Sequence, residues 1–383
     1  MFNKTTVSKK TAVLLHIGTG SVGVAYVSLK ETGPILHYAK RRHFEERGAL
    51  TIDRYLSRVL WAATSGVTEM AMNKAYASSK EVHCFIPSIL TSREIRKIKY
   101  THYSFNVTQC LITDLVEKEI ELIKKEDTTK NNKVLLEKKI IDIQLNGYSV
   151  DNPYNKKANE IVISMFISYT EKTIIEKLKN IIHQIFHMRT VYFHNTPLSL
   201  YSTVSMLFPK EENFTILNIS GEVSDVITSV DRGLSQIISF PFGSNTFLRL
   251  LGGELGVYIR EARGILGLYK NGELSDVAKE QVEKALLVIR GMWKESLRHL
   301  IREGNFYGGF PPRIFMSGDP TILTFLPEWF KESRKDLFNT DTNENFMVKE
   351  LNTQILYKHM SKGGDASHDP LLVLFSIFTN YLK

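Results

Sequence analysis

The sequence predicts an α/β protein of two duplicated lobes, with an α+β unit inserted into the first lobe. Three observations support this fold class. The chain has 383 residues, of which 43% are hydrophobic and 23% charged, as in folded proteins of two or three domains. A pattern of strand, glycine turn and strand opens the chain and returns near residue 214. Between the two copies lies a segment with strands and helices of its own.

The first lobe is expected to open with a β-hairpin. Residues 12–17 and 22–29 are short β-rich runs separated by glycines. This uncharged stretch imitates a signal peptide or a membrane span, but its glycines break it, so we expect neither a targeting segment nor a transmembrane helix. The other elements predicted for this lobe are a strand over 35–44, an amphipathic helix over 52–70 and a strand over 82–86.

The inserted α+β unit follows. Apolar residues at helical spacing predict helices over 113–125 and 171–188. Two β-rich runs, 134–150 and 161–169, flank the turn signals Asn146-Gly147 and Asn152-Pro153. These elements can form a small domain without the rest of the chain.

The second lobe repeats the opening pattern. Before it, a strand over 191–193 and a helix over 197–208 return to the first lobe, and the polar residues 210–213 are expected to form a hinge between the lobes. Strands over 214–219, 222–230 and 234–240, a helical stretch over 253–304, a strand over 313–316 and an apolar helix over 371–382 follow. The last helix is apolar nearly all round, so we expect it to be buried against the second lobe. The expected domains are 1–82 with 189–208, 83–188, 209–252 with 305–383, and the helical subdomain 253–304.

The two glycine turns are the candidate phosphate-binding loops. Successive backbone N–H groups in a tight turn can point at one anion, and small side chains allow close approach. Short hydroxyl side chains could donate to a phosphate, although a structural hairpin explains the same residues. The candidate residues are Gly18, Thr19, Gly20 and Ser21 in the first turn and Ser220, Gly221, Ser224 and Asp225 in the second.

This order of elements resembles the actin-like ATPase superfamily, and within it the cell-division protein FtsA and the type IV pilus assembly protein PilM. Residues 141–166 are similar to the inserted interaction subdomain of those proteins, and residues 239–243 are similar to the segment after their second phosphate loop. The resemblance implies ATP with Mg²⁺ between the lobes. It also implies division or pilus-assembly partners at the inserted unit, and a cytoplasmic location at the inner-membrane periphery, reached through a partner.

The sequence departs from that family at the nucleotide site. Active members place aspartates where His16 and Asn218 stand, and Mg²⁺ prefers such carboxylate oxygens. Glu222 replaces a glycine, and a second negative charge about 4 Å away would repel a phosphate by roughly 4 kcal/mol. Gly318 keeps part of the purine-side turn, and Glu261 keeps part of a helical nucleotide-contacting pattern. We therefore expect weak or lost ATPase activity.

Charge and cysteine content narrow the alternatives. The net charge of +8 comes from residues 1–100, which carry 16 Lys and Arg against 7 Asp and Glu, without a nucleic-acid-binding motif. Cys84 and Cys110 form no metal-ligand or disulfide pattern, which is typical of a reducing cytoplasm. The sequence predicts a scaffold protein. An active actin-like ATPase or kinase using Asp225 and Glu222, and a nucleotide-dependent filament or other homo-oligomer, remain open alternatives.

Overall fold

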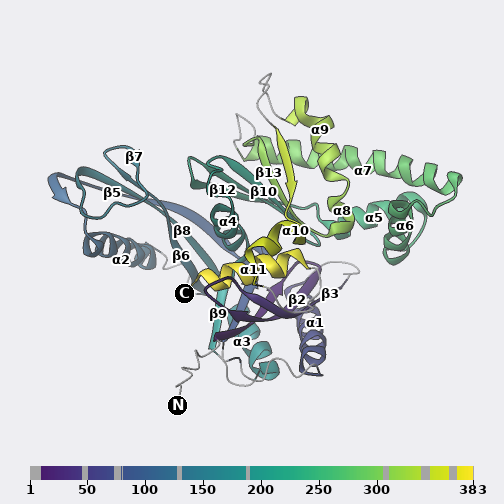
Figure 1. Ribbon diagram of the computed structural model, residues 1–383, viewed down its shortest axis with the longest axis horizontal. Helices are drawn as coiled ribbons and strands as arrows, with labels where there is room; N and C mark the ends of the chain where they lie inside the picture. The colour runs from purple at the N-terminus through teal and green to yellow at the C-terminus, as the bar shows by residue number, and fades with distance from the viewer. Residues whose placement is uncertain are drawn as a thin grey trace, which may run out of the picture.

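A computed structural model of the chain describes residues 10–44, 51–72, 79, 81–126, 132–186, 190–304, 310–337, 346–361 and 369–382 (Figure 1). Some predicted ranges extend beyond them: the end of the expected helix 171–188 and residues 1–9, 305–309, 338–345 and 362–368 of the expected lobes lie outside the described residues. In the described part, two five-stranded sheets and one four-stranded sheet form three units.

The first lobe is built on a sheet of order β3-β2-β1-β4-β9. Helices α1 and α3 share one apolar core with one face of this sheet, while α4 contributes to the core on the other face. The strands are β1 (Lys10–Ile17), β2 (Ser21–Leu29), β3 (Ile35–His43), β4 (Glu81–Ile86) and β9 (Thr190–Asn195), and the helices are α1 (Ile52–Met72), α3 (Lys172–Phe186) and α4 (Thr196–Leu207).

The second lobe has the sheet order β12-β11-β10-β13-β14, which repeats the order of the first lobe strand for strand. The duplication predicted from the sequence is therefore confirmed. The strands are β10 (Phe214–Ile219), β11 (Ser224–Val230), β12 (Gly233–Phe240), β13 (Arg313–Gly318) and β14 (Met347–Glu350). The helices are α5 (Ser244–Leu255), α6 (Ile259–Asn271), α7 (Asp276–Glu303), α8 (Pro320–Leu323), α9 (Leu326–Leu337) and α10 (Thr353–Leu356). The sequence analysis had placed no element at β14 or α9.

The inserted unit projects from the first lobe (Figure 1). Its sheet has the order β5-β8-β6-β7, and α2 packs against it. The elements are β5 (Ser92–Asn106), α2 (Gln109–Glu126), β6 (Lys133–Leu145), β7 (Tyr148–Ser149) and β8 (Lys157–Glu171). The sequence analysis placed no element at β5, whose many Lys and Arg residues interrupt any continuous apolar run. The strand is half exposed, so it tolerates those charges on its outer side.

Two elements near the limits of the inserted unit complete the first lobe. β4 pairs in parallel with β1 and β9 in the first sheet. Helix α3 buries Leu178 and Ile182 in the same core as α1. The predicted limits of the inserted unit, 83 and 188, would assign most of β4 and all of α3 to that unit, although both elements belong to the sheet and core of the first lobe. We therefore propose that the inserted unit extends from β5 to β8.

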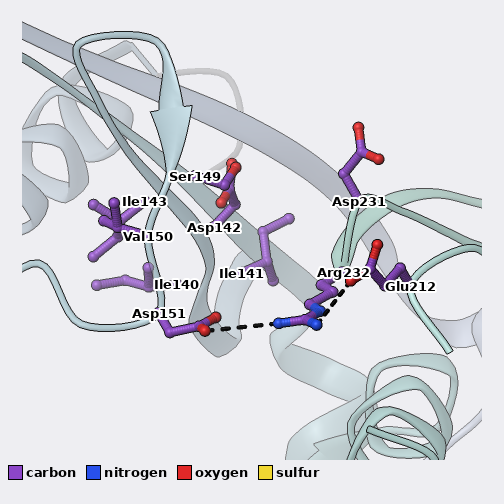
Figure 2. Close-up of a pocket in the computed structure, with 10 residues that line it drawn as sticks. All are labelled: Ile140, Ile141, Asp142, Ile143, Ser149, Val150, Asp151, Glu212, Asp231 and Arg232. Carbon is purple, nitrogen blue, oxygen red and sulfur yellow. Dashed lines mark hydrogen bonds and ion pairs between the residues drawn. The ribbon is translucent and has the colours of Figure 1, made fainter. Parts of the chain in front are cut away.

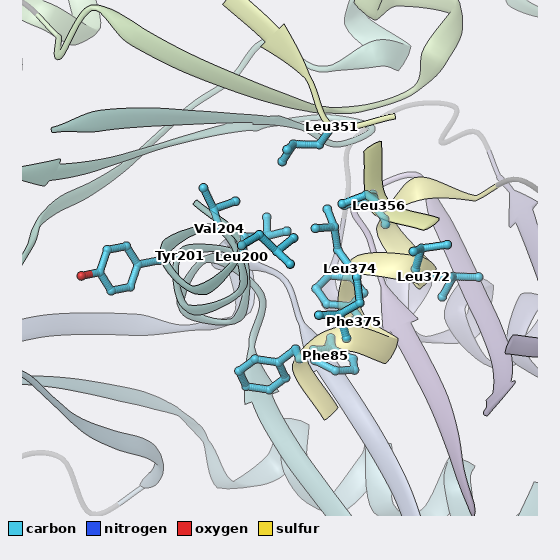
Figure 3. Close-up of a cluster of buried hydrophobic side chains, with 14 of the residues drawn as sticks. Phe85, Leu200, Tyr201, Val204, Leu351, Leu356, Leu372, Leu374 and Phe375 are labelled. Carbon is cyan, nitrogen blue, oxygen red and sulfur yellow. The ribbon is translucent and has the colours of Figure 1, made fainter. Parts of the chain in front are cut away.

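The C-terminal helix α11 (Pro370–Tyr381) is buried along almost its whole length. Figure 3 shows Leu374 and Phe375 near α4, and the Phe375 ring stacks on Phe85 of β4 at 4.2 Å. The helix also contacts β1, β2, β3 and β13. The expected burial is confirmed, but the helix lies between the lobes rather than against the second lobe alone. It is apolar all round because protein covers each of its faces. In the described part of the chain, no helix is long and apolar enough to span a membrane.

Candidate functional site: the cleft between the lobes

The two glycine turns meet in the cleft between the lobes. The Thr19 backbone N–H and hydroxyl both donate to the Ser220 hydroxyl, at 3.1 and 3.0 Å. In return, the Glu222 backbone N–H donates to the Thr19 hydroxyl at 2.7 Å. Thr19 is only 1% exposed. The hydroxyl groups that could have donated to a phosphate instead join one lobe to the other.

The glycines show how tightly the turns pack. A Cβ added to Gly221 would lie 2.4 Å from the Gly20 nitrogen and 2.5 Å from its Cα. A Cβ added to Gly20 would lie 2.6 Å from the Asn245 side-chain nitrogen. Neither glycine has the positive φ that favours glycine, so only the lack of space demands them here. Backbone touches backbone across the cleft, and a phosphate group does not fit between the two turns in this arrangement.

His16 and Arg41 occupy the first-lobe side of the cleft. The Arg41 guanidinium donates to Ser21 Oγ at 3.0 Å and lies 3.1 Å from His16 Nδ1, while Arg41 Nε forms an ion pair with Asp369 at 2.6 Å. Burial and the Arg41 charge lower the pKa of His16 well below its ordinary value, so the ring is neutral and accepts the bond. This side of the cleft already holds a cation, the Arg41 guanidinium.

Asp369 balances that cation. Its carboxylate also accepts a hydrogen bond from the Leu372 backbone N–H at 3.0 Å, which caps helix α11. Burial by itself would raise the pKa of Asp369, but the charge and hydrogen bonds of Arg41 hold this pKa below its ordinary value. The carboxylate is therefore ionised, and its charge is already matched inside the protein.

On the second-lobe side, one row of polar side chains crosses the sheet. Ser317, Asn218, Asp225 and Ser239 are register partners on β13, β10, β11 and β12. Ser317 donates to the Asn218 carbonyl at 3.0 Å, the Asn218 amide donates to Asp225 at 3.4 Å, and Ser239 donates to Asp225 at 2.6 Å. Arg93 of β5 then donates to Ser239 at 3.0 Å. The row links the cleft to the inserted unit and fully engages Asp225.

Glu222 does not face the space between the turns. Its carboxylate accepts from the Asn245 amide at 2.9 Å and pairs with Arg249 at 2.6 Å. The sequence analysis had worked out a repulsion between this charge and a phosphate. That repulsion requires an unpaired Glu222 beside the nucleotide, whereas here the neighbouring guanidinium neutralises it.

What space remains is a cavity of about 220 Å³ beside the turns. This volume is below the ~300–1,000 Å³ usual for small-molecule pockets. Gly318 lines it with a φ of 143°, and a Cβ there would lie 2.4 Å from the Ile219 carbonyl oxygen. Of the predicted residues, the cavity brings together Gly20, Ser21, Ser220, Gly221 and Gly318.

The other predicted residues serve the local structure. The Gly18 carbonyl accepts from the Tyr55 hydroxyl at 3.0 Å, and Ser224 donates to the Phe242 carbonyl at 2.5 Å. Glu261 accepts from the Tyr258 backbone N–H at 3.1 Å and so caps α6, away from the cavity.

Sequence reasoning missed three charged residues that shape the cleft: Arg41, Asp369 and Arg249. Arg41 stands between Lys40 and Arg42 in a basic run, where the sequence analysis placed no site residue. The alternation of side chains along β3 could have shown that Arg41 faces away from both neighbours. Nothing in the local pattern could have paired it with Asp369. Among the described residues, no three His, Cys, Asp or Glu side chains gather as metal ligands.

Comparison with known structures identifies the architecture. The structure of a PilM–PilN type IV pilus biogenesis complex matches with a TM-score of 0.63 and 10% sequence identity, covering 97% of this chain and 98% of the matched chain. The chain has the actin-like ATPase fold. Its structural resemblance to PilM extends over nearly the whole length of both proteins.

Two further structures align over most of their length with lower scores. The ethanolamine utilization protein EutJ from Carboxydothermus hydrogenoformans gives a TM-score of 0.47 at 11% identity, covering 97% of this chain and 90% of its own. A Bacteroides thetaiotaomicron protein with an actin-like ATPase fold and unknown function gives 0.42 at 11% identity, covering 99% of both. No protein-family model matches the sequence, and no curated protein matches it.

Proposed function

We propose that this chain is an actin-like scaffold of a bacterial cell-envelope machine, in type IV pilus assembly or cell division, and that it does not use ATP. The direct contact between the turns at Thr19 and Ser220 carries this proposal. The fold and the resemblance imply Mg²⁺-ATP between the lobes. The residues present do not fit that group, because the turns contact each other where its phosphates would need room.

The charges of the cleft point the same way. A hard divalent cation needs anionic or neutral oxygen ligands. Here, His16 offers a buried neutral ring. The Asn218 side chain already accepts a hydrogen bond from Ser317 and donates one to Asp225. The Arg41 guanidinium would also repel a metal ion placed beside it. The scaffold would therefore hold its two lobes together without a nucleotide.

The cleft can be tested with a disulfide between the turns. The Thr19 and Ser220 hydroxyl oxygens lie 3.0 Å apart, so cysteines at both positions should oxidise to a disulfide. The Cys110→Ser background removes the exposed thiol and leaves the buried Cys84. We expect rapid cross-linking that ATP with Mg²⁺ does not slow, and no heat of ATP binding in calorimetry of the wild-type protein. Mg²⁺-dependent ATP binding, or cross-linking that ATP suppresses, would support the active ATPase or kinase instead.

The partner-binding part of the proposal places docking on the inserted unit. This unit projects from the lobes (Figure 1) and exposes large aromatic side chains. Tyr103 on β5 is 93% exposed and Tyr148 on β7 is 78% exposed. The matched structure is of a PilM–PilN complex, so that protein is held by a pilus biogenesis partner. We infer that partner proteins also hold this chain, at the cytoplasmic periphery of the inner membrane.

A photo-crosslinking amino acid at Tyr103 or Tyr148 tests this docking surface in cells. The matched control is Tyr258 at the start of α6, a tyrosine that is also 78% exposed but lies in the second lobe. We expect mass spectrometry to identify pilus-assembly or division proteins on the two inserted-unit positions only. Cross-links to such proteins from Tyr258 alone would place docking elsewhere. Sedimentation velocity of the purified protein distinguishes a monomeric scaffold from a homo-oligomer or filament.

A further inference from the structure

A groove of about 440 Å³ lies between the inserted unit and the second lobe. β6 and β7 form one wall, and the hairpin between β11 and β12 forms the other (Figure 2). None of the residues that line this groove lines the cavity beside the glycine turns. The groove is therefore a separate candidate site, made by the meeting of two units.

The groove is acidic in a basic protein. Four carboxylates line it against a single guanidinium, while the whole chain carries a net charge of +8. The carboxylates belong to Asp142, Asp151, Glu212 and Asp231, and the guanidinium to Arg232. Such a local excess of negative charge attracts cations and repels anions.

The chain's own guanidinium shows which chemistry the groove accepts. Arg232 lies between the two walls, 2.7 Å from Glu212 on the second lobe and 3.7 Å from Asp151 on the inserted unit (Figure 2). Both pairs are largely exposed, so each is weak and easily exchanged. A guanidinium from another chain could therefore take the place of Arg232.

The backbone of the groove suits an extended chain. β6 pairs with β8 on one side, and its last residues, Gln144 and Leu145, pair with β7 on the other. The Val150 backbone N–H also donates to the Ile143 carbonyl on that side, at 2.9 Å. The register of β6 with β8 shifts between Ile140 and Asp142, which leaves Ile141 outside the regular ladder at the groove. Before Ile143, β6 has no ladder partner on this side, and this open edge offers its main chain and apolar side chains to a strand that adds to it.

We propose that this groove binds an extended basic peptide of a partner protein, which adds to the open edge of β6 and places Arg or Lys side chains among the four carboxylates. Apolar residues between the basic ones would pack on Ile140 and Ile143. The proposal deepens the scaffold function by naming the chemistry of a partner, and it rests on that function only for assigning the peptide to a partner protein.

The test uses the full chain and a fluorescein-labelled hexapeptide of alternating Arg and Val, measured by fluorescence anisotropy at low ionic strength. Asp151→Asn should weaken binding about fivefold. Arg232→Gly should strengthen it about fivefold, because it removes the competing guanidinium. Arg232 has a φ of 64° beside Asp231 at 50°, so an Asp-Gly pair suits this turn and should preserve the fold. Glu254→Gln, at an exposed position of α5, is the matched control and should change nothing.

Three further results distinguish the proposal from simple charge attraction. An alternating Glu and Val hexapeptide should not bind, and the basic peptide should slow amide hydrogen exchange over residues 140–143. The proposal would be overturned if spermine, at the same total charge, displaced the basic peptide. It would also be overturned if the peptide slowed amide exchange at other residues instead, or if the Asp151→Asn variant bound the peptide as tightly as wild type. The disulfide of the Thr19→Cys, Ser220→Cys variant reports on the closed cleft separately, so failure at the groove leaves the cleft result standing.

Discussion

Adding one methyl group to Gly221 tests whether the two turns are in contact in solution. The new Cβ would lie 2.4 Å from the Gly20 nitrogen, 2.5 Å from its Cα and 3.0 Å from the Thr19 carbonyl carbon. All three atoms belong to the backbone, so no side chain can rotate away. The Gly221→Ala variant must therefore move the hairpins apart by about 1 Å to reach ordinary contact distances near 3.5 Å.

The cost follows from the contacts that this movement breaks. Thr19 makes two hydrogen bonds to Ser220 and one with Glu222 across the cleft. At about 1 kcal/mol each, their loss should lower the free energy of unfolding by about 3 kcal/mol. Urea unfolding followed by circular dichroism measures this change.

The chain supplies a matched control for that variant. Gly264 lies within α6, and a Cβ added there would meet nothing within 4 Å. Gly264→Ala should stabilise the protein by about 0.5–1 kcal/mol, because alanine loses less backbone entropy in a helix. A Gly221→Ala variant that is as stable as wild type would show that the lobes stand apart in solution, and it would refute the closed cleft.

Three further tests concern buried ionisable side chains. Burial lowers the pKa of His83 in the folded protein from 6.5 to about 3. Between these two pH values only the unfolded chain binds the proton, so the free energy of unfolding falls as the pH drops. When the pH falls from about 7.5 to 5.5, the His83→Gln variant should lose about 1.4 kcal/mol less free energy of unfolding than wild type, as urea unfolding measures. Equal losses in the two proteins would contradict this. Arg41→Met leaves the Asp369 carboxylate buried without its partner and should cost about 3–5 kcal/mol, most of which Asp369→Asn should restore in the double variant. Additive losses in that thermal-unfolding cycle would mean that the pair is not coupled. Arg93→Met removes two hydrogen bonds from a charged donor and should lower the free energy of urea unfolding by about 3 kcal/mol. Amide exchange in β12 should also become faster. Unchanged exchange there would mean that Arg93 does not connect the inserted unit to the second lobe.

Much of the fold was predictable because it follows from local patterns. The glycine turns at Gly18 and Gly221 separate strands whose apolar residues are continuous, and each pattern forms the expected hairpin. Helix α11 is apolar nearly all round, which correctly predicted burial. Strand β5 was missed because its sequence is rich in Lys and Arg, and a half-exposed strand carries no continuous apolar signal.

The amino-acid sequence by itself predicted the repeat of strand, glycine turn and strand, and it places His16 and Asn218 where the resemblance implies aspartates. Only the tertiary structure decided which residues meet in the cleft. Thr19 and Ser220 are 201 residues apart, and Arg41 and Asp369 are 328 residues apart, yet each pair is in direct contact. Local periodicity carries no information about such pairs, because the packing of both lobes around α4 and α11 brings them together. The same packing sets the turns against each other, closes the cleft, and places Arg232 between the two walls of the acidic groove.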